Sequence, residues 1–341
     1  MSELRTLLVT GGAGFIGSHA CLELLENGYE VVVVDDFSNS VPAALERVEK
    51  LSGRTVTAYR ADLRDRAALA AVFDAHPIDA VLHFAAKKAV GESHQVPLQY
   101  YDVNVCGTVV LLDTMRHHGV HHLVFSSSCS VYGQPGATPI SEQAAPAPTS
   151  PYGRSKWMCE QVLRDACARY PRLCAVVLRY FNPIGAHDSG LLGENPVGTP
   201  HNVLPYLAQV AIGRRRHLHV FGRDYPTPDG TCIRDYLHVL DLAHGHRIAL
   251  EHLPGRPGLR TFNLGTGVGV SVLELVDAFS AACGRALPYR FVPRRPGDAA
   301  RLVADPALIA RTWGWRTGRD LAAMCRDAWR FTQLHPAGYD G

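Results

Sequence analysis

The segment Ser150-Pro-Tyr-Gly-Arg-Ser-Lys156 places a phenol and an ammonium four residues apart, directly after a Pro-rich stretch. On a helix, residues i and i+4 lie on one face, one above the other. An ordinary tyrosine has a pKa of about 10, so service as a base near neutral pH requires a lowering worth roughly 4 kcal/mol. A neighbouring ammonium acts in that direction. The spacing therefore indicates either a candidate base, Tyr152 activated by Lys156, or an ordinary surface pair.

The elements that must position this pair follow an alternating order. Short β-branched runs are interleaved with longer helical patterns, which predicts parallel strands and right-handed crossovers, a doubly wound α/β sheet of Rossmann type. Strands are expected at 6–10, 30–36, 79–86, 122–128 and 173–181, and a helix at 15–27. A capping box, Ser271 with Glu274, begins a later helix. We expect an NAD-binding domain over 1–182 and a smaller, mixed α/β substrate domain over 183–341, with 235–253 returning to the first domain.

The loop between the first strand and the first helix carries Gly11, Gly14 and Gly17. Glycines at such positions permit a tight turn, close approach of the backbone to a pyrophosphate, and close helix–strand packing. The helix N-terminus then directs its N–H groups at the phosphates. The second strand ends in Asp35, whose carboxylate can accept from an adenosine ribose 2′-hydroxyl and would repel a 2′-phosphate. The pattern predicts NAD rather than NADP as the cofactor.

The strand expected at 122–128 ends in three serines, at the edge where open α/β sheets bind their ligands. Tyr152 and Lys156 begin the next helix at the same edge. A hydroxyl, a phenol and a cation would therefore converge on the nicotinamide, whose positive ring also lowers the phenol's pKa. The small residues within 83–88 would let a cofactor lie across the strand ends, and Asp62 falls where an adenine could be bound. Ordinary turn chemistry is the alternative for both segments.

Composition excludes several classes of function. The chain has 341 residues with 34 Lys and Arg against 32 Asp and Glu, a net charge of +2 that favours neither nucleic acid nor a membrane surface as partner. No apolar run approaches the roughly 18 residues of a membrane span, and the N-terminus has no signal-peptide pattern. The nine cysteines are scattered singly, which is typical of reduced thiols. The 17 histidines lack the spacing of metal ligands. We expect a cytoplasmic protein without a metal.

Taken together, the glycine loop, the triple serine and Tyr-x-x-x-Lys resemble the extended short-chain dehydrogenase/reductase family. Seven segments are similar, in order, to the UDP-hexose 4-epimerases of that family: HFAAKKAVGES, SSSCSVYG, SPYGRSK, LRYFNPIGAH, FGRDYPTPDGTCIRDYLHV, NLGTGVGVSVLE and RRPGD. The resemblance extends from Leu7 to Tyr339. It implies an isomerase that interconverts UDP-galactose and UDP-glucose by transient oxidation at carbon 4, with tightly held NAD, and a homodimer.

The resemblance also implies roles for individual residues. Tyr152 is the base at the sugar 4-hydroxyl, Lys156 holds the nicotinamide ribose and lowers the phenol's pKa, and Ser128 bridges the hydroxyl and the phenolate. Cofactor contacts are expected from Gly11, Gly14, Phe15, Ile16, Gly17, Asp35, Asp36, Asn39, Ser40, Asp62, Leu63, Phe84, Ala85, Lys88, Asn104, Tyr152, Lys156 and Phe181. Substrate contacts are expected from Ser128, Asn182, Asn202, Val203, Phe221, Arg234, Tyr236, Arg295, Asp298 and Leu302. The two arginines would hold the diphosphate, and Asp298 the nucleotide ribose.

Three positions depart from the family's pattern. Val103 stands where some relatives carry a cofactor-contacting Asn, although Asn104 follows it, and Ala86-Lys87 replaces a common Gly-Leu pair. Leu302 occupies the position that gates the sugar pocket. In relatives, Tyr there restricts the substrate to glucose and galactose, and a small residue admits N-acetylated sugars. A leucine lies between the two, so activity on UDP-N-acetylhexosamines stays open.

Other functions on the same fold are distinguished by a few residues. A 4,6-dehydratase needs an Asp-Glu pair where this chain has Cys129-Ser130, which disfavours that reaction. A 4-epimerase of UDP-pentoses or UDP-uronic acids differs only in pocket contacts and remains an alternative. A catalytically silent NAD-sensing protein is the third alternative, since a fold does not imply activity. Such proteins typically lack the Tyr or the Lys, and this chain has both.

Overall fold

The computed structural model describes residues 4–196, 198, 200, 202–295 and 297–340. The chain divides into two compact units, each assembled from several segments. The first unit comprises Met1–Val131, Pro148–Arg179 and Ala243–Phe262, and the second comprises Tyr132–Ala147, Tyr180–Leu242 and Asn263–Gly341. Each unit therefore contains residues that are far apart in the sequence.

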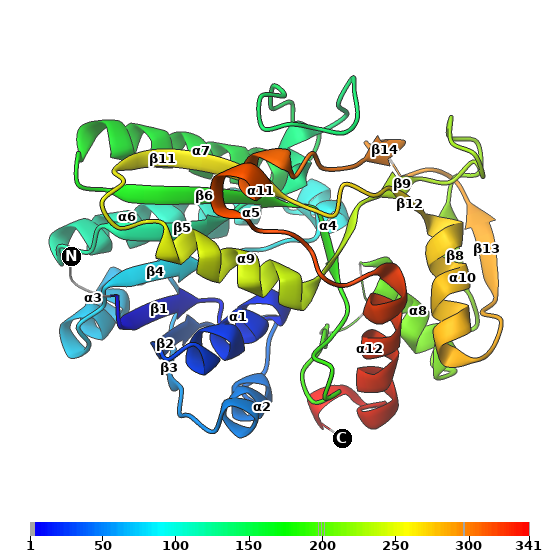
Figure 1. Cartoon of the computed structure of the whole chain (residues 1–341), viewed down its shortest axis with the longest axis horizontal. Helices are drawn as coiled ribbons and strands as arrows, with labels where there is room; N and C mark the ends of the chain where they lie inside the picture. The colour runs from blue at the N-terminus through cyan, green and yellow to red at the C-terminus, as the bar shows by residue number, and fades with distance from the viewer. Residues whose placement is uncertain (1–3, 197, 199, 201, 296, 341) are drawn as a thin grey trace. The chain divides into compact units, whose positions relative to one another are not determined.

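A seven-stranded sheet with the order β11-β6-β5-β4-β1-β2-β3 organises the first unit (Figure 1). Its strands are β1 (Thr6–Thr10), β2 (Glu30–Asp35), β3 (Thr57–Arg60), β4 (Ala80–His83), β5 (His122–Ser126), β6 (Cys174–Tyr180) and β11 (Gly258–Leu264). Every neighbouring pair from β3 to β6 is parallel. The doubly wound α/β fold expected from the alternating pattern is confirmed.

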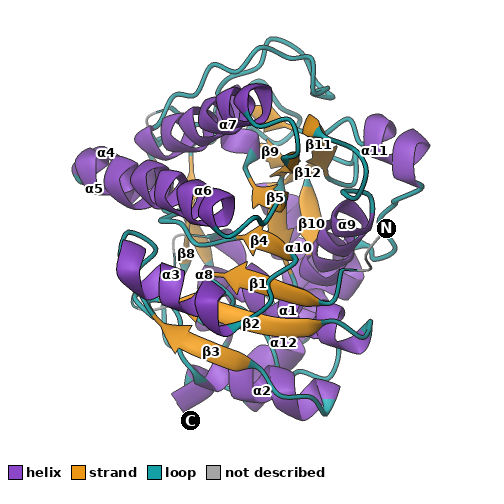
Figure 2. Cartoon of the chain, turned by 90° about the vertical axis from the view of Figure 1, so that its left-hand side faces the viewer, coloured by secondary structure: helices purple, strands orange, loops and turns teal. Residues whose placement is uncertain are grey.

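Helices cover both faces of this sheet. They are α1 (Phe15–Glu26), α2 (Ala43–Ser52), α3 (Arg66–Ala75), α4 (Val90–Gln95), α5 (Pro97–Tyr100), the π-helix η1 (Tyr101–Cys106), α6 (Gly107–His117), the short η2 (Cys129–Tyr132), α7 (Pro151–Arg169) and α9 (Val239–Glu251). Figure 2 shows α6 and α7 on one face of the sheet and α1 and α9 on the other. No helix in the described part of the chain is long and apolar enough to cross a membrane.

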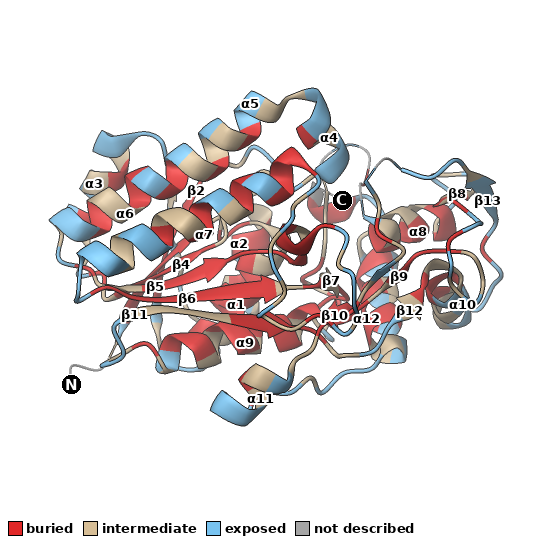
Figure 3. Ribbon diagram, turned by 90° about the horizontal axis from the view of Figure 1, so that it is seen from above, coloured by how far each residue is buried: buried red, intermediate tan, exposed pale blue. Residues whose placement is uncertain are grey.

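Burial on both faces explains the nearly continuous apolar runs of the strands. Leu8, Val81 and Leu123 of three neighbouring strands pack with Leu111 of α6 and Leu163 of α7 in one core. Figure 3 shows the strands buried between helices whose outer sides are exposed. The packed sheet fixes the loops that follow the carboxyl ends of β1, β2, β4 and β5.

The second unit is built from short strands and three packed helices. The strand pairs are β7 (Asn182–Ile184) with β10 (Tyr236–His238), and β8 (Leu218–Phe221) with β13 (Tyr289–Val292), both parallel. A third sheet places β9 (Ile233–Arg234) between β12 (Val270–Ser271) and β14 (Arg301–Leu302). The helices are α8 (Val203–Ala211), α10 (Val272–Cys283), α11 (Ala307–Trp313), α12 (Leu321–Leu334) and η3 (Gly338–Asp340). Leu207, Leu275 and Met324 join α8, α10 and α12 in one core.

The sequence-based elements differ from the observed ones in a few places. The strand β3 was not predicted, because its residues Thr-Ala-Tyr-Arg lie at the sheet edge, are mostly exposed and form no apolar run. The strands expected at 79–86 and 122–128 end earlier, at His83 and Ser126. The capping box of α10 is confirmed: Ser271 accepts from the Glu274 amide and the Glu274 side chain accepts from the Ser271 amide.

Candidate active site

The glycine loop after β1 is shaped as a dinucleotide pyrophosphate requires. Gly11 has a φ of 70°, and a Cβ at this residue would lie 2.6 Å from the Ala85 amide nitrogen. A Cβ at Gly17 would lie 2.1 Å from the Gly11 carbonyl oxygen, so only glycine lets α1 approach the loop. Phe15 and Ile16 begin the first turn of α1, which contains no acidic side chain and is not capped by a side chain at Gly14. The backbone amides of this turn and the positive end of the helix dipole are therefore available to bind an anion.

Asp35 lies at the end of β2, beside this loop. Its carboxylate accepts from the Ala13 amide at 3.0 Å, from the Phe37 amide at 2.9 Å and from the Ser40 hydroxyl at 2.8 Å. These bonds hold a negative charge next to the loop, which fits an NAD ribose and disfavours an additional phosphate. Asn39, in the same turn, is exposed.

Other residues assigned to the cofactor lie in the loops after β2, β3 and β4. Asp36 accepts from the Ser38 amide and hydroxyl, and Asp62 forms a 2.5 Å ion pair with Arg64, which holds the pKa of the Asp62 carboxyl below its ordinary value. Leu63 is buried, Ala85 is half-buried and Lys88 is exposed. The ring of Phe84 lies 4.6 Å from that of His246, whose Nε2 is 2.8 Å from the Ser126 hydroxyl.

Asn104 is the buried residue of the π-helix η1, and its carboxamide forms hydrogen bonds within the protein. Its Oδ1 accepts from the Lys87 amide at 2.8 Å, and its Nδ2 donates to the Lys87 carbonyl and to the Ser155 hydroxyl. Asn104 therefore fixes the loop after β4 against α7, and its contact with the cofactor stays a prediction.

Tyr152 stands in the first turn of α7, where the local sequence places it. Ser150 caps the helix by accepting from the Gly153 amide at 3.1 Å, and Pro151 takes the first helical position. A Cβ at Gly153 would lie 2.6 Å from the Ser130 carbonyl oxygen, so this glycine lets the helix approach the segment after β5. The Ser128 hydroxyl of that segment is close enough to the Tyr152 phenol to lower its pKa, and it donates to the Ser130 hydroxyl at 3.1 Å. The pairing of Ser128 with Tyr152 as the base stays a prediction.

Lys156 lies one turn further along α7 and is equally buried. Its Nζ donates to the Ser126 carbonyl at 2.8 Å and sits 4.9 Å from the centre of the Phe125 ring. Burial lowers the pKa of Lys156 to about 8, although the nearby Cys159 and Glu160 act in the opposite direction. The ammonium is thus held at the end of β5 by a backbone carbonyl and an aromatic face.

The pKa of Tyr152 shifts in the direction opposite to the one expected from its neighbour. Burial raises it to about 12, and the hydrogen bond from Ser128 opposes this only in part. The expectation that Lys156 would depress it rested on the i, i+4 spacing, which ignores the desolvation of both groups. The described chain by itself therefore keeps Tyr152 protonated at neutral pH.

A buried ion pair that the sequence analysis did not predict supports the serine triplet. Glu160 of α7 and Arg179 of β6 are joined at 2.6 Å, and the Ser127 hydroxyl donates to Glu160, also at 2.6 Å. Each serine thus has a separate contact, since the Ser126 carbonyl accepts from Lys156, the Ser127 hydroxyl donates to Glu160 and Ser128 lowers the pKa of Tyr152. The sequence pattern that could have indicated Glu160 is its i, i+4 spacing from Lys156.

In the second unit, the structure brings together several residues assigned to the substrate. Arg234 of β9 donates to Asp298 at 3.1 Å, and Leu302 of β14 is its neighbour in the parallel ladder. Arg295 stacks on the Phe221 ring at 3.9 Å, and its carbonyl accepts from the Asp298 amide. Two guanidinium groups, a carboxylate and an aromatic ring therefore lie close together. This combination of groups suits the binding of a nucleoside diphosphate.

Other residues assigned to the substrate lie on β7, on β10 and at the start of α8. Asn182 pairs with Tyr236 across β7 and β10, and its buried Oδ1 has no hydrogen-bond partner among the residues that the structure describes. Such an acceptor is costly unless a ligand satisfies it. Asn202 caps the N-terminus of α8 next to Val203, and its side chain donates to Glu194 at 3.1 Å. Phe181, which was assigned to the cofactor, is buried, and its amide donates to the Leu264 carbonyl.

Metal ligands are not grouped in this part of the molecule. Among the described residues, no three His, Cys, Asp or Glu side chains are arranged to hold a metal ion.

A parallel sheet with a glycine loop after its first strand, an Asp at the end of the second strand and a Ser-Tyr-Lys set is typical of dinucleotide-dependent enzymes of the doubly wound α/β class. The family model for the NAD dependent epimerase/dehydratase family matches residues 7–265. The chain belongs to this family.

Individual relatives are similar over almost the whole chain. UDP-glucose 4-epimerase of Yersinia pestis is 52% identical, covering 98% of this chain and 99% of the relative. The crystal structure of UDP-glucose 4-epimerase from Bifidobacterium longum in complex with NAD+ and UDP superposes with a TM-score of 0.96 at 48% identity, covering 98% of this chain and 100% of that one. The UDP-glucose 4-epimerase of Stenotrophomonas maltophila, with bound NAD and formylated UDP-arabinopyranose, gives 0.95 at 49% identity, covering 98% and 99%.

Proposed function

We propose that the protein interconverts UDP-galactose and UDP-glucose by transient oxidation at carbon 4 of the sugar, with NAD as the tightly held cofactor. The observation that carries the proposal is the buried Tyr152 phenol, whose pKa is lowered by Ser128 and which lies one helical turn from the Lys156 ammonium. The similarity to UDP-glucose 4-epimerases over 98% of the chain supports this substrate pair.

The residues of the chain divide the work between binding and proton transfer. Bound NAD supplies the acceptor, and later the donor, of the hydride at carbon 4. Tyr152 takes the proton of the 4-hydroxyl and returns it, and Ser128 relays the hydrogen bond between them. Because burial raises the pKa of Tyr152 to about 12, the phenol loses its proton only when positive charge is brought beside it. Lys156 holds the nicotinamide ribose and contributes to that charge.

In the second unit, the side chains retain the sugar nucleotide throughout. Arg234 and Arg295 bind the diphosphate, Asp298 binds the ribose of the nucleotide, and Asn182 offers its unsatisfied carbonyl oxygen to a sugar hydroxyl. Tight retention lets the oxidised sugar turn over and be reduced on its other face without escaping.

Leu302 is the residue on which activity toward a second class of substrate, the UDP-N-acetylhexosamines, is proposed to depend. It is half-buried, smaller than Tyr and unable to donate a hydrogen bond. UDP-N-acetylgalactosamine is therefore expected to be accepted more slowly than UDP-galactose. Leu302→Tyr should reduce the rate on the N-acetylated substrate about tenfold and leave the rate on UDP-galactose within a factor of about three. Equal effects on both substrates would contradict the gating role.

We also propose a homodimer that works in the cytoplasm. The helices α5, α6 and α7 lie together (Figure 3) and expose Leu98, Val109 and Met158 to 80%, 40% and 44%. Apolar side chains that are exposed on neighbouring helices are consistent with a protein interface. All nine cysteines lie in the described part of the chain as free thiols, which agrees with a reducing compartment. Sedimentation of the purified protein tests the dimer.

The deciding experiment is an assay of the purified protein with UDP-galactose, without added NAD, in which UDP-glucose is detected by a coupled dehydrogenase. Turnover is expected and would establish both the reaction and the retained cofactor. No turnover after NAD binding has been verified would reject the hexose reaction. UDP-pentoses and UDP-uronic acids would then be assayed, and inactivity on all of them would favour the NAD-sensing protein.

A further inference from the structure

Asp235 is a fully buried carboxylate between two residues assigned to the substrate, Arg234 and Tyr236. Its Oδ1 accepts from the Thr266 amide at 2.8 Å and from the Thr266 hydroxyl at 2.6 Å. Its Oδ2 accepts from the Gly267 amide at 2.9 Å and from the Ala304 amide at 3.1 Å. One side chain therefore joins the turn after β11 and the segment after β14 to the junction of β9 and β10.

The backbone of Asp235 also forms hydrogen bonds, and both of its partners are residues assigned to the substrate. Its amide donates to the Leu302 carbonyl at 3.0 Å, and its carbonyl accepts from the Asn182 amide at 2.9 Å. Leu302, Asn182 and the adjoining Arg234 are thus each one covalent or hydrogen-bonded step from a single residue. These three residues are the ones proposed to gate the sugar, to bind it and to hold the diphosphate.

Among the residues that the structure describes, hydrogen bonds alone compensate the burial of this carboxylate. A buried charge is costly unless it is fully satisfied, and here four donors satisfy it. A Cβ at Gly265 would lie 2.6 Å from Oδ2, so the turn approaches the carboxylate as closely as a glycine allows. Because β9 and β14 are two residues long, their ladder supplies little restraint, and the side chain takes over that task.

We propose that Asp235 is a positioning residue that fixes Leu302 relative to Arg234 and Asn182, and thereby determines both the affinity for the UDP-sugar and the selectivity for its substituents. This inference rests on the proposed function of the second unit's residues. Asp235 itself touches neither the sugar nor the diphosphate in this role. It acts through the position of the residues that do.

The test is Asp235→Asn in the full chain. The carboxamide can accept only at its oxygen, and its NH₂ would face two donors, either the Gly267 and Ala304 amides or the Thr266 amide and hydroxyl. We expect the Kd and KM for UDP-galactose to rise about tenfold while kcat changes less than about threefold. The ratio of kcat/KM for UDP-N-acetylgalactosamine over UDP-galactose should change at least about fivefold. The amount of bound NAD should stay the same.

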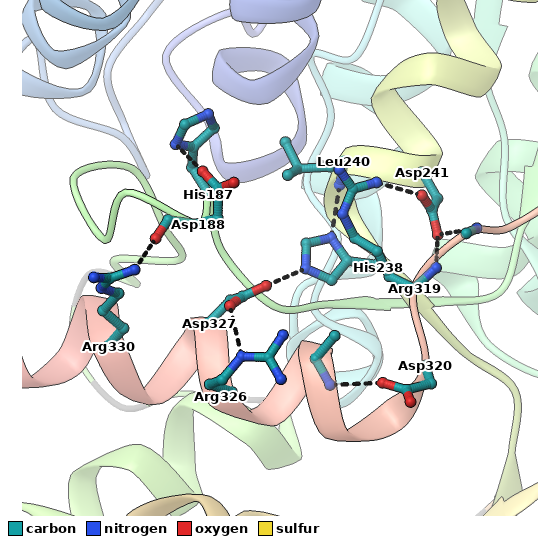
Figure 4. Close-up of polar contacts among 12 residues, drawn as sticks. His187, Asp188, His238, Leu240, Asp241, Arg319, Asp320, Arg326, Asp327 and Arg330 are labelled. Carbon is teal, nitrogen blue, oxygen red and sulfur yellow. Dashed lines mark hydrogen bonds and ion pairs between the residues drawn. The ribbon is translucent and has the colours of Figure 1, made fainter.

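Asp241 provides the matched control, because it is another buried carboxylate of the second unit. It is 4% exposed and accepts from the Gly318 amide, the Arg319 amide and the Arg319 guanidinium (Figure 4). Asp241→Asn should lower the melting temperature comparably and leave the Kd and the selectivity ratio unchanged. If both variants shift Kd and selectivity equally, or neither does, Asp235 has only a structural role and the inference is wrong.

Thr266→Val provides a milder variant, in case the Asn variant fails to fold. It removes one of the four donors to the carboxylate and leaves the three backbone amides in place. The same direction of change in Kd and selectivity is expected, by about twofold to threefold. No change in either would overturn the inference. Calorimetric Kd values do not depend on turnover, so a wild type that binds UDP-galactose without converting it would count against the proposed function alone.

Discussion

In the first unit, Tyr152 and Lys156 stand on a helix of 19 residues beside a sheet of seven strands, whereas in the second unit Arg234 and Leu302 stand on strands of two residues each. The first pair is placed by continuous backbone hydrogen bonding and a packed core. The second pair depends on side chains that join short segments. The residues proposed for proton transfer thus lie on regular elements, and the two residues proposed to hold the UDP-sugar lie on short, irregular ones.

Buried carboxylates replace regular structure in the second unit. Asp235 joins three segments, Asp241 caps the turn at Gly318 and Arg319, and Asp327 of α12 lies 3.2 Å from His238 of β10 (Figure 4). His238 Nδ1 accepts from the Leu240 amide, so its Nε2 carries the proton that is donated to Asp327. Burial lowers the pKa of His238 to about 4, which keeps the ring neutral. Substitutions at these buried carboxylates are expected to be poorly tolerated, because one substitution removes several hydrogen bonds at once.

The comparison predicts that first-unit variants act on kcat. Tyr152→Phe removes the proton acceptor and should lower kcat for UDP-galactose about 10³-fold, with KM changed less than about threefold. Tyr100 is the matched control, since its buried ring lies 6.5 Å from that of Tyr152 and its phenol bonds Ala89 and Glu92. Tyr100→Phe should retain kcat within about threefold. Equal losses in the two variants would refute the role of the phenol as base.

The ion pair of Glu160 and Arg179 is a buried ionic contact in the first unit, comparable to the buried carboxylates of the second unit. Glu160→Gln leaves a buried guanidinium without its counter-charge and should lower the free energy of unfolding by about 3 kcal/mol, measured by urea denaturation. The double variant Glu160→Met, Arg179→Met removes both charges and should recover most of that loss. If the double variant is as unstable as the single one, regular structure does not suffice to hold the first unit.

Second-unit variants should act on KM instead. Arg234→Met removes the guanidinium that contacts Asp298, and KM for UDP-galactose should rise about 10²-fold with kcat changed less than about threefold. The exposed Arg294, which stacks on Tyr225 at 4.1 Å, is the control, and Arg294→Met should change KM less than about threefold. A fall in kcat without a rise in KM for Arg234→Met would remove the distinction between the units.

The smallest predicted effect is a pH dependence set by Lys156. Burial lowers its pKa to about 8, so the ammonium is present below that pH and lost as the pH rises through it. Wild-type kcat should therefore fall about tenfold per pH unit above pH 8. Lys156→Arg keeps the charge at all these pH values, and although its kcat is lower, the falling limb should disappear. A limb that persists in the arginine variant would assign it to another group.

Much of the first unit was predictable, because its determinants are local. Gly11 and Gly17 mark a turn that only glycine can make, Ser150 and Pro151 mark a helix start, and the apolar runs mark buried strands. The exposed strand β3 lacked such a run and was missed. The contacts of Asp235 with Thr266 and Ala304 span 31 and 69 positions, and no local pattern announces them.

The sequence by itself determined the class of fold, the phosphate loop and the placement of Tyr152 and Lys156 on one helical face, because each follows from spacing along a regular element. The tertiary structure alone decided how those groups ionise, since the pKa of Tyr152 rises with burial, which depends on everything packed around it. It also decided which residues meet around Asp235. Desolvation and long-range hydrogen bonding are properties of the folded chain, and neither is encoded in any short segment of it.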